Sequence, residues 1–253
     1  MKDRIVTLKK TARLAGLLYL LLAITAIYGF FYVSPKIRVS GDTVATARNM
    51  IAHELLFRSS IATDLISNVL FVAVVLLLYR LFRQVDEHLA KLMAALVAVA
   101  IPVALLGGAL KITALGIIKG DMDSFQSMQM QQLAETCIRL GSYSGQIITI
   151  FWGLWLLPLG LLVYRSVFIP RVLGILLIIN GFGYMVSSLT FILFPEYLAS
   201  VSKITFPTYF IGEIPFIFWL LIVGVRDHLS ITIIAETDTQ VELKRERQEE
   251  PVH

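Results

Sequence analysis

The chain has 253 residues, of which 57% are hydrophobic and 16% are charged, with a mean hydropathy of +0.77 and a formal net charge of +4. Soluble globular domains carry about 25% charged residues, so this composition excludes an ordinary soluble protein. The basic residues flank the apolar blocks instead of forming one patch, which argues against a nucleic-acid partner. The single cysteine, Cys137, excludes an internal disulfide framework.

The apolar residues gather in blocks of about 20, the length of a helix that crosses a bilayer. We therefore predict an all-α, polytopic membrane protein in which residues 1–226 form one domain of six transmembrane helices. The predicted spans cover residues 14–33, 60–79, 92–118, 142–164, 172–194 and 206–225. Residues 227–253 are polar and have no apolar face to bury, so we predict a largely disordered cytoplasmic tail.

Two polar segments between the spans are expected to form extracytoplasmic helices that lie along the membrane surface. After the first span, Pro35 and Gly41 are expected to break the chain, and Ser40 or Asp42 to cap a short amphipathic helix. Residues 119–141 are expected to form a second short helix that ends near Gly141. An ordinary loop helix that covers the bundle is the alternative interpretation of the first segment.

Proline and glycine residues predict bends within two of the spans. The third span is longer than a perpendicular helix requires, and Pro102 together with two adjacent glycines provides a place to bend. In the sixth span, Pro215 lacks a backbone N–H, so we expect a kink beside Glu213.

The distribution of Lys and Arg predicts the orientation. With six spans, fourteen of these residues lie on the side that holds both termini, and seven lie on the opposite side. Both termini are therefore predicted to be cytoplasmic. The first span is expected to stay uncleaved, because no small-residue cleavage site follows it.

Several fragments resemble a bacterial membrane family catalogued as domain of unknown function 4386. They are TARLAGLLYL at 11–20, ELLFRSSIATDL at 54–65, LLYRLFRQVDEHLAKLMA at 77–94, FIPRVLGILLIINGFGY at 168–184 and IGEIPFIFWLLIVGVR at 211–226. The resemblance covers about residues 8–226 and implies a six-helix protein of the bacterial cytoplasmic membrane. It implies no activity.

Ionisable residues inside the spans are the candidate functional residues, since an Asp at the centre of a membrane helix costs about 2.5–3.5 kcal/mol on insertion scales. With the predicted spans, the polar residues fall at a similar depth near the outer surface. This coincidence predicts an outward-facing polar pocket, made by Asp64, Asn68, Lys111, Gln146 and Glu213 inside the spans and by Glu54 and Arg58 at the edge. The same residues have other uses: Lys111 can reach out to the headgroups, Asp64 can pair with Arg58, and Gln146 can join two helices.

Within this pocket, Lys111 and Glu213 are expected to neutralise each other. They have opposite charge, a shared predicted depth and neighbouring distortions of their helices. Asp64 is the alternative partner of Lys111. In either arrangement a lone buried charge would cost several kcal/mol, so each charge needs a partner.

No catalytic or metal-binding motif accompanies these residues. The four histidines, His53, His88, His228 and His253, lie outside the spans and never occur at the i, i+4 spacing of a helical zinc site. No cofactor is therefore predicted, and membrane lipids are the expected surroundings. We favour binding, sensing or transport of a small or lipid-like ligand. The alternative is an enzyme acting on a lipid or isoprenoid, with Glu54, Asp64 or Glu213 as acid or base and two carboxylates within reach of one substrate.

Overall fold

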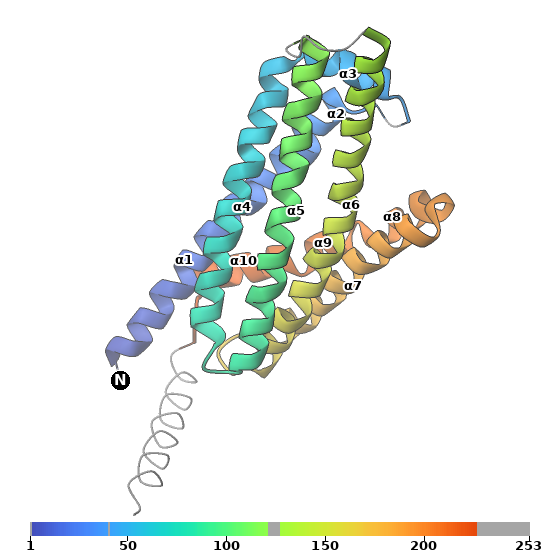
Figure 1. Cartoon of the computed structure of the whole chain (residues 1–253). Coiled ribbons are helices and arrows are strands. Elements are labelled where there is room, and N and C mark those ends of the chain that lie inside the picture. Colours follow the sequence, from blue (N-terminus) through green and yellow to red (C-terminus); the bar gives the residue numbers. More distant parts are fainter. Residues whose placement is uncertain (1, 40, 121–126, 227–253) are drawn as a thin grey trace, which may run out of the picture.

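The computed structural model describes residues 2–39, 41–120 and 127–226, with side chains described over 6–39, 41–120 and 132–226. All secondary structure in this part of the chain is helical (Figure 1), as predicted. Six segments of it are long and apolar enough to cross a membrane: Val6–Ile37, Glu54–Phe82, Glu87–Lys119, Gln132–Arg165, Arg171–Leu193 and Pro195–Ile222. The predicted disordered tail, 227–253, lies outside the described residues.

The first membrane segment continues past the predicted break. Helix α1 (Lys2–Ile27) runs through a π-helical turn, η1 (Tyr28–Val33), into α2 (Ser34–Ile37). Pro35 does not break the chain there, because it lies at the start of α2, where a helix needs no N–H donor. The helix ends at Arg38, whose backbone is extended. Helix α3 (Thr43–Ala52) follows as predicted, with the Asp42 side chain accepting from the Ala45 N–H at 2.8 Å.

Three long helices form the body of the molecule. They are α4 (Glu54–Phe82), α5 (Glu87–Lys119) and α6 (Ser127–Arg165). The side chain of Asp86 caps the start of α5, and Gly120, with a φ of 79°, ends it in the left-handed conformation. The prediction of a separate short helix that ends near Gly141 is wrong. Helix α6 runs through Gly141 without a break, because this glycine packs against Gly107 and Leu110 of α5.

The last membrane segment is broken, and its position differs from the prediction. Helix α7 (Arg171–Leu193) is followed by η2 (Pro195–Tyr197), α8 (Leu198–Thr205), α9 (Thr208–Ile211) and α10 (Glu213–Ile222). The expected distortion near Glu213 is present, but it occurs at Gly212, between α9 and α10. Pro215 lies in the first turn of α10 and has no N–H for the carbonyl of Ile211, the last residue of α9, so the break lies where the missing donor predicts it.

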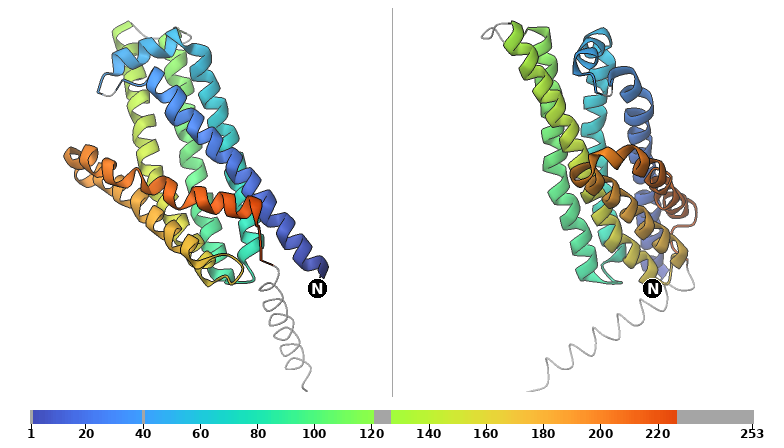
Figure 2. Two further views of the ribbon diagram at one scale, coloured as in Figure 1. Left: turned by 180° about the vertical axis from the view of Figure 1, so that it is seen from behind. Right: turned by 90° about the vertical axis from the view of Figure 1, so that its right-hand side faces the viewer.

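The helices close into a ring at the end of the molecule that holds the N-terminus. Each of α1, α4, α5, α6, α7 and α10 packs against the next, and α10 packs back onto α1. Figure 2 shows α10 crossing α1 while α7 and α8 run side by side away from the upright helices. The larger hydrophobic cluster fills this ring with residues such as Leu78, Met93, Leu159 and Phe216. We call it the ring core.

A second hydrophobic cluster lies at the opposite end, where α2 and α3 cover the long helices (Figure 1). We call it the cap core. It consists of Val33, Ile37, Met50, Phe57, Ile61, Ala114, Leu115, Ile117, Ala134 and Cys137. Helices α7 to α10 contribute nothing to it. At ~1.5 Å per residue, the 29, 33 and 39 residues of α4, α5 and α6 measure about 44–58 Å, more than the ~30 Å of a bilayer interior.

Glycine pairs allow α6 and α7 to approach closely. A Cβ atom added to Gly153 would lie 2.5 Å from the Gly181 carbonyl oxygen, and one added to Gly174 would lie 2.6 Å from that of Gly160. Small residues at such contacts are how membrane helices pack against each other. This contact fixes α7, which carries two residues of the site described next.

Candidate functional site

Glu213 is the first residue of α10, directly after the break at Gly212. Three neutral donors surround its carboxylate. Oε1 accepts a short hydrogen bond from the Tyr19 hydroxyl. Oε2 accepts from Asn180 Nδ2 at 3.0 Å and from the Tyr184 hydroxyl at 3.3 Å. These donors come from α1 and α7, so the carboxylate joins three membrane segments.

The surroundings of this carboxylate are mostly aromatic. The rings of Tyr184 and Tyr209 stack with centroids 4.1 Å apart, and Tyr184 also contacts Trp152 of α6. The ring of Tyr19 lies 6.0 Å from that of Trp155. Glu213 itself is partly buried, whereas the side chains of Tyr19 and Asn180 are buried in the bundle. We call Glu213, Tyr19, Asn180, Tyr184 and Tyr209 the Glu213 centre.

Asn180 has more hydrogen-bonding capacity than it uses. Its Nδ2 donates to the Tyr209 carbonyl at 3.4 Å in addition to Glu213. Its Oδ1 is buried and accepts no hydrogen bond within the described part of the chain. A buried acceptor without a donor costs about 1–3 kcal/mol, so this atom is available to accept a further hydrogen bond.

No basic side chain neutralises Glu213. Within residues 6–39, 41–120 and 132–226, where side chains are described, no Lys, Arg or His forms an ion pair with it. The expected pair of Lys111 and Glu213 is therefore wrong. Lys111 Nζ binds the alternative partner, Asp64 Oδ2, at 2.7 Å.

The depths of these residues explain the error. Gly153, twelve residues before Arg165, packs on Gly181 beside Asn180, which places the Glu213 centre about 18 Å along α6 from its basic end. Lys111 is twenty residues beyond Lys91, about 30 Å along α5. The sixth segment starts at Pro195 and passes through α8 and α9 before Glu213, so this residue lies about half-way along the bundle and not at the depth of Lys111.

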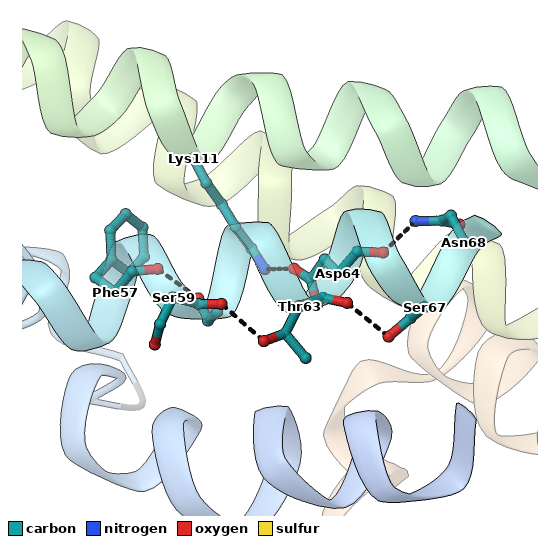
Figure 3. A network of polar contacts seen from close by, with 8 residues as sticks. Phe57, Ser59, Thr63, Asp64, Ser67, Asn68 and Lys111 are labelled. Carbon is teal, nitrogen blue, oxygen red and sulfur yellow. Dashed lines mark hydrogen bonds and ion pairs between the residues drawn. The ribbon is translucent and has the colours of Figure 1, made fainter. Parts of the chain in front are cut away.

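The Asp64–Lys111 pair joins α4 to α5 near the cap core, as Figure 3 shows. The side chains are 44% and 39% exposed, so the pair is open to its surroundings. Asn68, predicted to share the site, donates to the backbone carbonyl of Asp64 at 2.8 Å. Nearby, Thr63 and Ser67 donate to backbone carbonyls one turn earlier in α4, a use that satisfies their hydroxyls locally.

The remaining predicted residues lie in two other places. Glu54 binds Arg58 at 2.8 Å and Lys119 at 3.0 Å where α4 begins and α5 ends, so Arg58 is not the partner of Asp64. Gln146 accepts a hydrogen bond from Ser188 through its backbone carbonyl, at 2.9 Å. A surface cavity of about 600 Å³, lined by Tyr28, Tyr32, Leu55, Leu56 and Ser59, contains none of the predicted site residues.

Sequence reasoning identified Glu213 but missed its partners. The available signal for Asn180 and Tyr184 is their i, i+4 spacing, which places both on one face of α7. Tyr19 carried no signal of its own, because one tyrosine in a leucine-rich span is an ordinary core residue. In the portion where side chains are described, no three His, Cys, Asp or Glu residues are grouped to hold a metal ion.

Comparison with known proteins gives the family. The family model described as "Domain of unknown function (DUF4386)" matches residues 14–224, a range that includes the whole Glu213 centre. The chain belongs to the DUF4386 family. The predicted resemblance is thus confirmed, and this DUF4386 chain is a polytopic membrane protein.

One curated relative of this DUF4386 protein is an uncharacterized protein of Archaeoglobus fulgidus. It is 40% identical over 75 residues, which are 30% of this chain and 43% of that protein. The chain therefore matches less than half the length of this relative. No solved structure matches the chain.

Proposed function

We propose that this protein binds a small or lipid-like ligand carrying a positive charge at the Glu213 centre, and transports or senses it. The observation that supports this most is the Glu213 carboxylate, which lies about half-way along the bundle beside a helix break and whose hydrogen-bond partners are all neutral. Broken helices and ionisable residues near the bilayer midplane are typical of ligand and ion sites in transporters.

A comparison of the carboxylates supports a cationic ligand. Asp64 and Glu54 already bind lysine or arginine side chains. Glu213 has hydrogen-bond donors but no positive charge, so a cation would complete its electrostatic balance.

The enzyme alternative requires two carboxylates that can reach one substrate. Glu54 and Asp64 are ten residues apart on α4, about 15 Å along the helix, and each binds a different lysine. Glu213 bonds to neither of these groups. This separation favours binding over acid–base catalysis.

For the location, we propose the cytoplasmic membrane of a bacterium, with both termini in the cytoplasm and α3 at the outer membrane surface. The arrangement of the ends supports this orientation. The N-terminus and the α4–α5 and α6–α7 turns lie at one end of the molecule, as Figure 1 shows. This end carries the larger share of Lys and Arg, which is typical of the cytoplasmic side.

The test measures binding of tetraphenylphosphonium, choline and the neutral analogue tetraphenylmethane to purified protein in lipid nanodiscs. At least one cation should raise the melting temperature of the wild type, whereas the neutral analogue should not. Glu213→Gln should lose this effect, and the control Asp64→Asn, which removes a carboxylate elsewhere, should keep it. Equal stabilisation of Glu213→Gln and wild type by every cation would contradict the proposal. Native mass spectrometry of the purified protein would then search for a co-purifying ligand.

A further inference from the structure

We propose that Glu213 also binds a proton, which is exchanged for the cationic ligand at the same carboxylate. This inference rests on the proposed function, because it names what neutralises the site when the ligand is absent. The chemistry is a proton transfer alone. An O–H bond forms at Glu213 with a proton taken from water, and it breaks, with the proton returning to water, when the cation arrives.

Three hydrogen-bond donors stabilise the ionised form of Glu213. Tyr19, Asn180 and Tyr184 donate to the carboxylate, and hydrogen bonds to a charged form stabilise it. Even so, a negative charge near mid-membrane without a cation remains costly. A proton is the smallest cation that removes this charge, and it needs no cavity.

The centre can also accommodate the protonated form, because it has an unused acceptor in Asn180 Oδ1. A protonated carboxyl group becomes a donor and needs an acceptor. If the amide of Asn180 turns by half a rotation, Oδ1 takes the place now held by Nδ2, which is 3.0 Å from Glu213 Oε2. The Oδ1 atom, which accepts nothing in the present arrangement, then accepts from the carboxyl group.

The titratable groups that face Glu213 are few. They are Tyr19 from α1, Tyr184 from α7 and Tyr209 from α9. Helix α6 contributes Trp152 and Trp155, and α4 contributes Phe71 behind Trp155, none of which titrates. Tyrosine ordinarily titrates near pH 10, so a titration of this centre below about pH 9 belongs to Glu213.

Protonation would change how the helices are joined. Tyr19 holds α1 to the start of α10 through the carboxylate, and the neutral acid is a weaker acceptor than the charged form. The break at Gly212 lies directly beside Glu213, so α10 can respond there without unfolding a continuous helix. Proton binding is therefore placed to loosen the contact between α1 and α10.

The test is infrared difference spectroscopy of the full chain in nanodiscs between about pH 9 and pH 5, the range in which buried carboxyl groups titrate. A carboxylic-acid C=O band should grow as the pH falls. It should be missing from Glu213→Gln and present in the control Asp64→Asn. An unchanged band in Glu213→Gln would overturn the proposal, and so would a midpoint set by sodium concentration instead of pH.

A second variant keeps the test decisive if Glu213→Gln does not fold. Tyr19→Phe removes one donor to the ionised form and should raise the titration midpoint by about one to two pH units, since a hydrogen bond to a charged group is worth about 1.5–3 kcal/mol and one pH unit corresponds to about 1.4 kcal/mol. A merely structural role of Tyr19 would leave the midpoint unchanged, and that result would overturn the proposal.

Calorimetry of tetraphenylphosphonium binding in buffers of different ionisation enthalpy separates the two proposals. Release of about one proton per cation below the midpoint is the expected result. Binding that depends on Glu213 but releases no proton would overturn the exchange and leave the proposed function intact. Protonation of Glu213 without binding of any cation would overturn the proposed ligand class.

Discussion

The cap and the ring of this protein use charge in opposite ways. Around the cap core, Asp64 binds Lys111, and Glu54 binds Arg58 and Lys119. These side chains are between 31% and 52% exposed. Inside the ring, Glu213 lies among neutral donors and aromatic rings. Ion pairs are cheap where water or headgroups solvate them, whereas an unpaired carboxylate in mid-membrane is costly. The cap carboxylates thus have basic partners within the protein, whereas the ring carboxylate is the one to which we assign the proposed ligand.

The largest expected effect concerns which region faces the outside. In a Cys137→Ser background, a cysteine at Arg48 in α3 should be labelled completely in intact cells by an impermeant maleimide. A cysteine at His88, at the start of α5, should not be labelled until the membrane is opened. Both positions are exposed in the protein, so accessibility depends on the side of the membrane alone. Labelling of His88→Cys and protection of Arg48→Cys would reverse the orientation.

The tight packing of the ring predicts the largest effect on stability. Gly174→Val should lower the free energy of unfolding by about 3 kcal/mol or more, because its Cβ would lie 2.6–2.7 Å from backbone atoms of α6 that cannot move aside. Gly108→Ala is the matched control, since no atom lies within 4 Å of the added Cβ. Thermal unfolding in detergent measures both. Equal melting temperatures would mean that α6 and α7 are further apart than described.

The Tyr19–Glu213 contact should show strong coupling. In a double-mutant cycle of Tyr19→Phe and Glu213→Met, we expect a coupling free energy of about 1.5–3 kcal/mol, the usual range for a hydrogen bond to a charged group. Chemical unfolding at pH 8 measures it. Additive losses would place Tyr19 outside the centre.

The smallest effect is expected for the cap ion pair. The cycle of Asp64→Asn and Lys111→Met should give about 0.2–1 kcal/mol, because both side chains are more than one-third exposed. High salt should reduce this value further. The control cycle of Lys111→Met and Glu213→Gln should be additive, since these residues bind different partners. A larger coupling between Lys111 and Glu213 than between Lys111 and Asp64 would remove the distinction between cap and ring.

Much of the fold follows from local sequence. Six apolar blocks predict six membrane segments, because the bilayer sets the length of each helix. Asp42 predicts the start of α3, since its side chain satisfies a free N–H of the next residues. The continuity of α6 through Gly141 was harder to predict, because a glycine can end a helix at one site and pack inside a helix at another. Only the contact with α5 decides this case.

The sequence by itself determined the membrane class, the number of spans and the presence of an ionisable residue, Glu213, inside a span, since hydropathy and the cost of a buried charge are local properties. The tertiary structure alone decided the partners of each charge. The α8–α9 segment places Glu213 half-way through the bundle, the glycine contacts bring α7 beside it, and the crossing of α10 over α1 supplies Tyr19. Residues 194 positions apart in the chain meet through this packing, and no local pattern encodes such a meeting.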